Sequence, residues 1–165
     1  MRWPSDRAPV LTRLQFMVAL ADTDFFNMTA PAFLQWAGRG SIELWDRLGV
    51  PIPALVERGL GIVVRRAELD FVAEGHLSDR VTMITRMLKL GTSSLELGHQ
   101  FVRDSDQVEL ANLTQTAVFV SMSERRSQPI PDDLRSALMA LADGCAPEPI
   151  NSEMPLPQAL PKARS

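Results

Sequence analysis

The second half of the chain is dominated by alternating apolar and polar residues, which is the pattern of half-buried β-strands. The alternation extends over four segments that short polar sequences separate: residues 61–74, 79–90, 94–103 and 108–123. Long segments joined by short turns favour antiparallel, meander-like pairing. An apolar segment with partial alternation, residues 11–21, predicts a further strand near the beginning of the chain.

Residues 31–48 show a different periodicity, with apolar or small residues three and four positions apart. This spacing predicts an α-helix, and the apolar stripe is wide enough for a helix that is covered on most sides. Pro31 suits the first helical turn, and Thr29 is a candidate N-cap. Gly38 and Gly40 each disfavour a helix by about 1 kcal/mol relative to alanine, which suggests that the helix backbone closely approaches another element.

The expected order is a strand, a loop, a long buried helix and four long strands. A short helical turn over residues 54–58 and a last helix over residues 134–142, with Asp132 as N-cap, complete it. This order fits an α+β fold in which an antiparallel five-stranded sheet wraps around one long central helix, and it also fits a two-layer α+β sandwich. One helix covers only part of such a sheet, so we expect a homodimer or homotetramer.

The two ends of the chain lack this periodicity. Residues 1–10 are expected to be an irregular N-terminal arm, and residues 144–165, which are rich in proline, a mobile tail. Residues 11–143 then form a single domain, because a chain of 165 residues with 45% hydrophobic content can build one proper core.

Composition narrows the functional classes. The net charge of −3 provides no basic surface, so we expect no nucleic-acid partner. Cys145 is the single cysteine, so an intrachain disulfide is excluded. No apolar run approaches the roughly 18 residues of a membrane span, and residues 1–9 do not form a secretory signal, so a cytoplasmic protein without a membrane partner is expected. No cluster of metal ligands is evident, and neither a metal nor a cofactor is expected.

The junction between the first strand and the long helix carries the candidate chemical groups. Asp22 and Asp24 flank Thr23 there, and short acids at such a junction can cap a turn or act chemically. We interpret Asp24 as the chemical candidate and Asp22 as the residue that caps or orients the loop. Asn27 can either donate a hydrogen bond to a ligand or bond its own backbone.

Several segments, taken in order, resemble a known family. They are DTDFF at residues 22–26, FLQW at 33–36, Phe71 followed by DRV at 79–81, LGTSSL at 90–95, FV at 119–120 and PIPD at 129–132. Over roughly residues 11–142 the chain resembles the hot-dog-fold acyl-CoA thioesterases of the 4-hydroxybenzoyl-CoA thioesterase type. The segment LQWAGR at 34–39 is also similar to hot-dog thioesterases of polyketide pathways, which suggests secondary metabolism.

The resemblance implies a hot-dog fold and hydrolysis of an acyl-CoA or acyl-carrier-protein thioester. In that family the second acid of the triplet is the catalytic carboxylate, so the resemblance assigns to Asp24 the role of general base or nucleophile. The thioester carbonyl faces the amino end of the central helix, where free N–H groups and the helix dipole stabilise an oxyanion. Asn27 is expected to add a side-chain donor.

Two charged residues of the helix are further catalytic candidates. Some branches of the family carry the working carboxylate in the central helix, so Glu43 or Arg39 is expected to assist. The alternative is that Glu43 forms surface ion pairs with Arg39 and Arg47, one turn away on either side. The residues expected to bind substrate are Phe25, Phe26, Met28, Thr29 and His76.

Two other functions remain open. Residues 27–30 are one position short of the family's usual pattern, which favours a hot-dog enzyme that adds water or an amine to an α,β-unsaturated acyl thioester. The other alternative is a protein that binds acyl thioesters without catalysis.

Overall fold

The computed structural model describes residues 8–25 and 27–144. Residues 1–7 of the predicted arm, Phe26, and the predicted tail from Cys145 onward lie outside the described residues. All of the predicted strands and helices lie within the described part. Phe26 belongs to the loop before the long helix.

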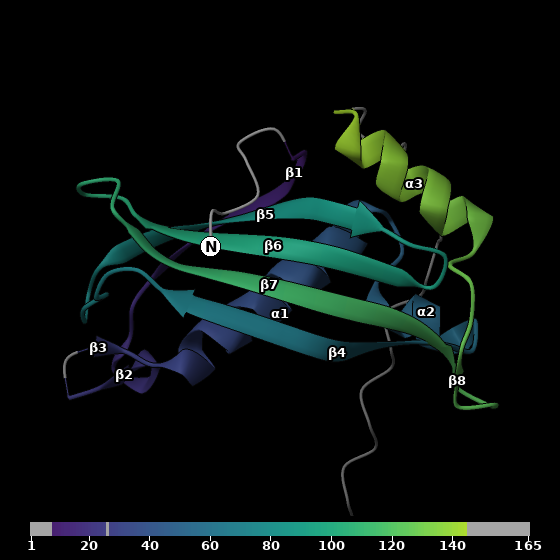
Figure 1. Ribbon diagram of the computed structural model, residues 1–165, viewed down its shortest axis with the longest axis horizontal. Helices are drawn as coiled ribbons and strands as arrows, with labels where there is room; N and C mark the ends of the chain where they lie inside the picture. Colours follow the sequence, from purple (N-terminus) through teal and green to yellow (C-terminus); the bar gives the residue numbers. More distant parts are fainter. Residues whose placement is uncertain (1–7, 26, 145–165) are drawn as a thin grey trace, which may run out of the picture.

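Five long antiparallel strands form a curled sheet (Figure 1). They are β1 (Val10–Met17), β4 (Leu60–Phe71), β5 (Arg80–Leu90), β6 (Ser94–Arg103) and β7 (Glu109–Ser121). The order across the sheet is β1-β5-β6-β7-β4, and a short strand, β8 (Arg126–Ser127), pairs with β7. The predicted α+β fold, with five long strands curled around one long helix, is confirmed.

The meander is shorter than predicted. β5, β6 and β7 are successive neighbours, but β4 pairs with β7 and not with β5. Both edges of β5 are taken, by β1 and by β6, so the chain crosses to the other side of the sheet between β4 and β5. The alternation of apolar residues specifies which face a strand buries but not which strand lies beside it, and this is why β4 was misplaced.

One long helix, α1 (Ala30–Arg47), runs across one face of the sheet (Figure 1). Gly40 marks a close approach, because a Cβ atom there would lie 2.6 Å from Met83 Cε and 3.1 Å from Thr85 Oγ1. A Cβ atom at Gly38 would have no described atom within 4 Å. The prediction of close approach is therefore confirmed for Gly40 and wrong for Gly38.

The shorter elements differ from prediction at their boundaries. The first strand ends at Met17 rather than residue 21, and the 3₁₀-helix η1 (Leu20–Asp22) follows it with Leu20 exposed. The predicted turn and helical turn after α1 form α2 (Ile52–Glu57). The last helix, α3 (Asp132–Ala142), has Pro131 as its N-cap, so Asp132 is its first residue and not its cap.

The core consists of two apolar clusters under α1. One surrounds Leu44 and Trp45 and includes the buried side of α3, and the other surrounds Phe33 and Phe101. Phe33 and Phe101 pack edge to face with ring centroids 4.9 Å apart. The first turns of α1, and the loop before them, are thereby held firmly against the sheet.

Candidate active site

A short hairpin presents Asp24 in front of α1. Its strands, β2 (Thr23–Asp24) and β3 (Asn27–Met28), pair Asp24 directly with Asn27. Phe25, at the turn, has a φ angle of 49° and a side chain that is 95% exposed. Directly paired residues of an antiparallel ladder point to the same face, so the carboxylate of Asp24 and the carboxamide of Asn27 are neighbours.

The two acids of the triplet have different surroundings. Asp22 is buried, and its Oδ2 accepts the Ala19 N–H at 2.9 Å while its carbonyl oxygen accepts the Thr29 N–H at 3.0 Å. This confirms the interpretation of Asp22 as the residue that orients the loop. The Asp24 side chain is exposed and makes no hydrogen bond to another residue of the described part. Its carboxylate is therefore free to meet a ligand.

The start of α1 offers few backbone donors. Thr29 is the N-cap as predicted, but its hydroxyl donates to the Asp22 carbonyl oxygen, 3.4 Å away, and caps no helix N–H. The N–H groups of Ala32 and Phe33 both point to the Thr29 carbonyl oxygen, at 3.0 and 3.4 Å. Pro31 has no N–H. The Ala30 N–H is left as the first-turn amide without a partner among the described residues.

The loop between β4 and β5 packs beside the hairpin. The Met28 N–H donates to the Gly75 carbonyl oxygen at 2.8 Å, and Asn27 and His76 form an isolated antiparallel bridge. His76 lies between two carboxylates, with Nε2 3.6 Å from Glu74 Oε2 and Nδ1 3.8 Å from Asp79 Oδ2. The structure thus brings His76 to the hairpin, as the prediction of a substrate-binding role requires.

Arg103 holds the loop between β4 and β5 in place through a hydrogen bond to its backbone. Its Nη1 donates to the Glu74 carbonyl oxygen at 3.0 Å, and its guanidinium also bonds Asp106 at 2.8 Å. The hydrogen bond from Arg103 lowers the pKa of Asp106, and the pKa of Arg103 rises for the same reason. Arg103 is therefore engaged within the chain.

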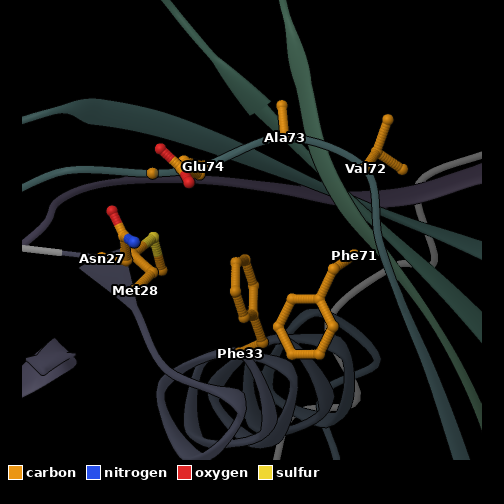
Figure 2. Close-up of a pocket in the computed structure, with 8 residues that line it drawn as sticks. Asn27, Met28, Phe33, Phe71, Val72, Ala73 and Glu74 are labelled. Atoms are coloured by element: carbon orange, nitrogen blue, oxygen red, sulfur yellow. The ribbon is translucent and has the colours of Figure 1, made fainter.

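A hollow of about 310 Å³ lies between the hairpin, the start of α1 and the end of β4 (Figure 2). Its polar side carries Asn27 and Glu74, and its apolar side carries Phe33 and Phe71, whose rings meet edge to face at 5.9 Å. Met28 supplies a further wall. The side chains combine an apolar surface with a polar margin that includes Asn27, the strand partner of Asp24.

Sequence reasoning placed Asn27 and Met28 at this site but missed Phe33, Phe71 and Glu74 as lining residues. The aromatic pair is separated by more than thirty residues in the chain and meets only through the fold. No local signal in the sequence distinguishes these two rings from the other phenylalanines of the chain.

The charged helix residues lie apart from Asp24 within one chain. The Arg39 guanidinium lies 4.6 Å from the centre of the Trp36 ring, and Glu43 accepts a hydrogen bond from Arg47 at 3.2 Å. Glu43 is 13 positions after the first helical residue, about 20 Å along the axis. The ion-pair interpretation therefore fits Glu43 and Arg47, and an assisting role for Glu43 or Arg39 stays a prediction.

Metal ligands and membrane-spanning helices are two further features to consider in the described ranges, 8–25 and 27–144. No group of three or more His, Cys, Asp or Glu side chains there could hold a metal ion. None of the helices in these ranges is long and apolar enough to cross a membrane.

Comparison with known proteins assigns the family. The sequence profile of the thioesterase-like superfamily matches residues 18–138, and the chain belongs to this family. The membership confirms the prediction of a thioester hydrolase. A search of curated proteins gave no match to the chain.

Solved structures share the fold. 1,4-Dihydroxy-2-naphthoyl-CoA thioesterase from Synechocystis is 19% identical with a TM-score of 0.71, over 77% of this chain and 94% of that one. A gentisyl-coenzyme A thioesterase is 23% identical with a TM-score of 0.67, over 78% and 99%. A Staphylococcus aureus protein in complex with CoA is 12% identical with a TM-score of 0.76, over 94% and 100%. These likenesses confirm the hot-dog fold.

Proposed function

We propose that the protein hydrolyses an acyl-CoA thioester and that Asp24 is its catalytic carboxylate. The observation that carries the proposal is the hairpin, which presents an unengaged carboxylate opposite a carboxamide, directly before a helix N-terminus. Family membership supports the reaction class. The CoA complex of a structural neighbour and the CoA thioesters in the names of two others support CoA as the thiol.

The reaction follows from the groups at this site. A water oxygen attacks the thioester carbonyl carbon while Asp24 takes one of its protons as general base. The negative charge that develops on the carbonyl oxygen is stabilised by the Asn27 carboxamide, by the Ala30 N–H and by the positive end of the α1 dipole. Collapse of this intermediate breaks the carbon–sulfur bond, and the leaving thiolate receives the proton that Asp24 took from water, which restores the carboxylate. Direct attack by Asp24, through an anhydride that water then hydrolyses, is the other route open to the same carboxylate.

A homodimer through β4 is the assembly that we propose. β4 is 12 residues long and, within the described chain, pairs with another strand along one edge only. Val63, Val64 and Phe71 on this strand are 48%, 55% and 60% exposed. A long free edge that exposes apolar side chains can pair with a second chain. Antiparallel pairing of two β4 edges about a two-fold axis would bury it.

This dimer would affect the site. The hollow lies at the Phe71 end of β4, and antiparallel pairing would bring the Leu60 end of the partner strand next to it. Each site would then be completed by the second protomer. The second half of α1 packs near the Leu60 end of β4, so the same pairing would bring the partner's α1, with Arg39 and Glu43, toward this hollow.

The test compares two substitutions in one loop. Asp24→Asn removes the proposed base, and we expect kcat for thiol release from an acyl-CoA panel to fall by about 10²- to 10⁴-fold. Asp22→Asn is the matched control, because the Asp22 carboxylate is buried and already accepts the Ala19 N–H. It should lower the melting temperature while activity per folded molecule stays within about tenfold of wild type. Equal loss of activity in both variants would contradict the assignment.

A further inference from the structure

The loop between β4 and β5 contacts the hairpin that carries Asp24 through two neighbouring residues. The Gly75 carbonyl oxygen accepts the Met28 N–H at 2.8 Å, and His76 forms an antiparallel bridge with Asn27. A Cβ atom at Gly75 would lie 2.9 Å from Met28 Sδ, so glycine lets the two segments approach closely. The position of Asn27, and of Asp24 paired with it, therefore depends on where this loop lies.

The loop is held in turn by the guanidinium group of Arg103, at the end of β6. Arg103 Nη1 donates to the Glu74 carbonyl oxygen at 3.0 Å and to Asp79 Oδ2 at 3.4 Å. The same Asp79 oxygen accepts the His76 N–H at 2.9 Å. The residues on both sides of Gly75 are thus bonded either to Arg103 or to the carboxylate that Arg103 contacts.

Asp106 fixes the orientation of this guanidinium group. Arg103 Nε and Nη2 donate to the two carboxylate oxygens of Asp106, at 3.0 and 2.8 Å, which is the paired geometry of an arginine fork. This pairing leaves Nη1 on the remaining side, where it meets the Glu74 carbonyl oxygen. A lysine ammonium is a point charge and cannot form the paired bonds to Asp106 while it also donates to the loop.

We propose that Arg103 is a positioning residue for the proposed thioesterase reaction, because it holds the β4–β5 loop against the hairpin that presents Asp24 and Asn27. Arg103 does not line the hollow and acts through the loop rather than on the substrate. A catalytic group displaced by about 1 Å can lower a rate by about 10²-fold, so loss of this support should reduce catalysis. The inference rests on the proposed function and adds a residue on β6 to it.

The first test is the kinetics of Arg103→Met with the acyl-CoA that wild type hydrolyses fastest. We expect kcat for thiol release to fall about 10- to 100-fold, while the Kd of a non-hydrolysable thioether analogue stays within about threefold of wild type. Arg103→Lys keeps the charge without the fork, so its kcat should fall by about fivefold or more, and it replaces Arg103→Met if that variant does not fold. A kcat within about threefold of wild type for either folded variant, or weaker analogue binding with unchanged kcat, overturns the inference.

The matched control is Arg58→Met, which removes another arginine–aspartate pair. Arg58, the C-cap of α2, lies 2.9 Å from Asp133 of α3, at the end of the sheet away from the hairpin (Figure 1). Loss of this partly exposed ion pair should change stability little and kcat per folded molecule by no more than about twofold. Equal reductions of kcat by Arg58→Met and Arg103→Met would show a general effect on the fold and would overturn the positioning role.

A second measurement does not depend on catalysis. Hydrogen exchange of the Met28 N–H reports the bond to the Gly75 carbonyl oxygen that links the hairpin to the loop. We expect Arg103→Met to speed this exchange by about tenfold or more, and Arg58→Met to leave it within about threefold of wild type. If Asp24→Asn keeps full activity, the proposed function fails, but the exchange rate still shows whether Arg103 holds the hairpin. Unchanged exchange in Arg103→Met overturns the inference.

Discussion

Asp22 and Asp24 carry the same side chain two positions apart, and the fold gives them opposite surroundings. The first is buried and holds the Ala19 N–H, and the second is exposed opposite Asn27. The difference was accessible from sequence, because capping is a local interaction that depends on residue type and position. What Asp24 faces depends on the ligand and on the proposed second chain, and no local pattern encodes either.

Asn27 has a testable role at this scale. Its carboxamide is cross-strand from Asp24 and is the side-chain donor that we assign to the thioester carbonyl oxygen. We expect Asn27→Ala to lower kcat for thiol release by about 10²-fold, because one oxyanion donor is lost. Steady-state kinetics measures it, and KM should change little. A lower affinity with unchanged kcat would show that Asn27 binds the ground state instead.

His99 predicts how stability depends on pH. Its folded-state pKa is about 4, below the ordinary 6.5, so the unfolded chain binds more protons between these values. His99 therefore contributes up to about 3 kcal/mol to the free energy of unfolding. This contribution is complete above pH 6.5 and is lost as the pH falls toward 4.

Urea unfolding of His99→Gln at pH 7 and pH 4.5 checks this expectation. The free energy of unfolding of wild type should be lower at pH 4.5 than at pH 7, and this difference should be much smaller in His99→Gln. His76→Gln is the control, because the His76 side chain is about half exposed. An identical decrease in wild type and His99→Gln would show that His99 does not titrate as described.

At the scale of elements, periodicity predicted α1 and all five long strands. It failed where an element is too short to show a period, as in the two-residue strands β2 and β3. It also failed where a segment is apolar but not extended, as at Leu20 in η1. Pairing of β4 with β7 joins residues up to 61 positions apart, and alternation carries no information about such contacts.

The packing of α1 gives a prediction for its two glycines. A methyl group at Gly40 would displace Met83 Cε and crowd Thr85 Oγ1, whereas one at Gly38 would meet no described atom. We expect Gly40→Ala to be less stable than Gly38→Ala by about 1 kcal/mol or more, although alanine favours the helix equally at both sites. Denaturant melts of the two variants measure the difference. A Gly40→Ala variant as stable as Gly38→Ala would show that the helix can move away from the sheet.

At the scale of the whole molecule, β1 and β4 are the two edge strands of the described sheet, and β4 is the longer of them. The sequence predicted that a partner is needed, because one helix cannot cover a five-stranded sheet. The sequence could not indicate which edge of the sheet a partner would occupy, because that depends on the strand order. The hollow near Asp24 also depends on the arrangement of the elements, because it forms where β4, α1 and the hairpin meet.

The dimer can be tested with two apolar residues of similar exposure. Val63 on β4 is 48% exposed, and Met139 on α3 is 45% exposed. We expect Val63→Lys to weaken dimerisation by at least about tenfold in Kd, because a lysine on an edge strand opposes pairing, and Met139→Lys to leave it unchanged. Light scattering during size-exclusion chromatography measures the mass. A monomeric wild type, or equal effects of both substitutions, would contradict assembly through β4.

The most direct test of the central claim is thiol release by Asp24→Asn under single-turnover conditions. The substrate is the best acyl-CoA for wild type, and circular dichroism and the Kd for a thioether analogue verify fold and binding. The proposed role of Asp24 predicts a rate constant about 10² to 10⁴ times lower, with Kd within about threefold of wild type. A rate constant within threefold of wild type would show that Asp24 is not the catalytic carboxylate.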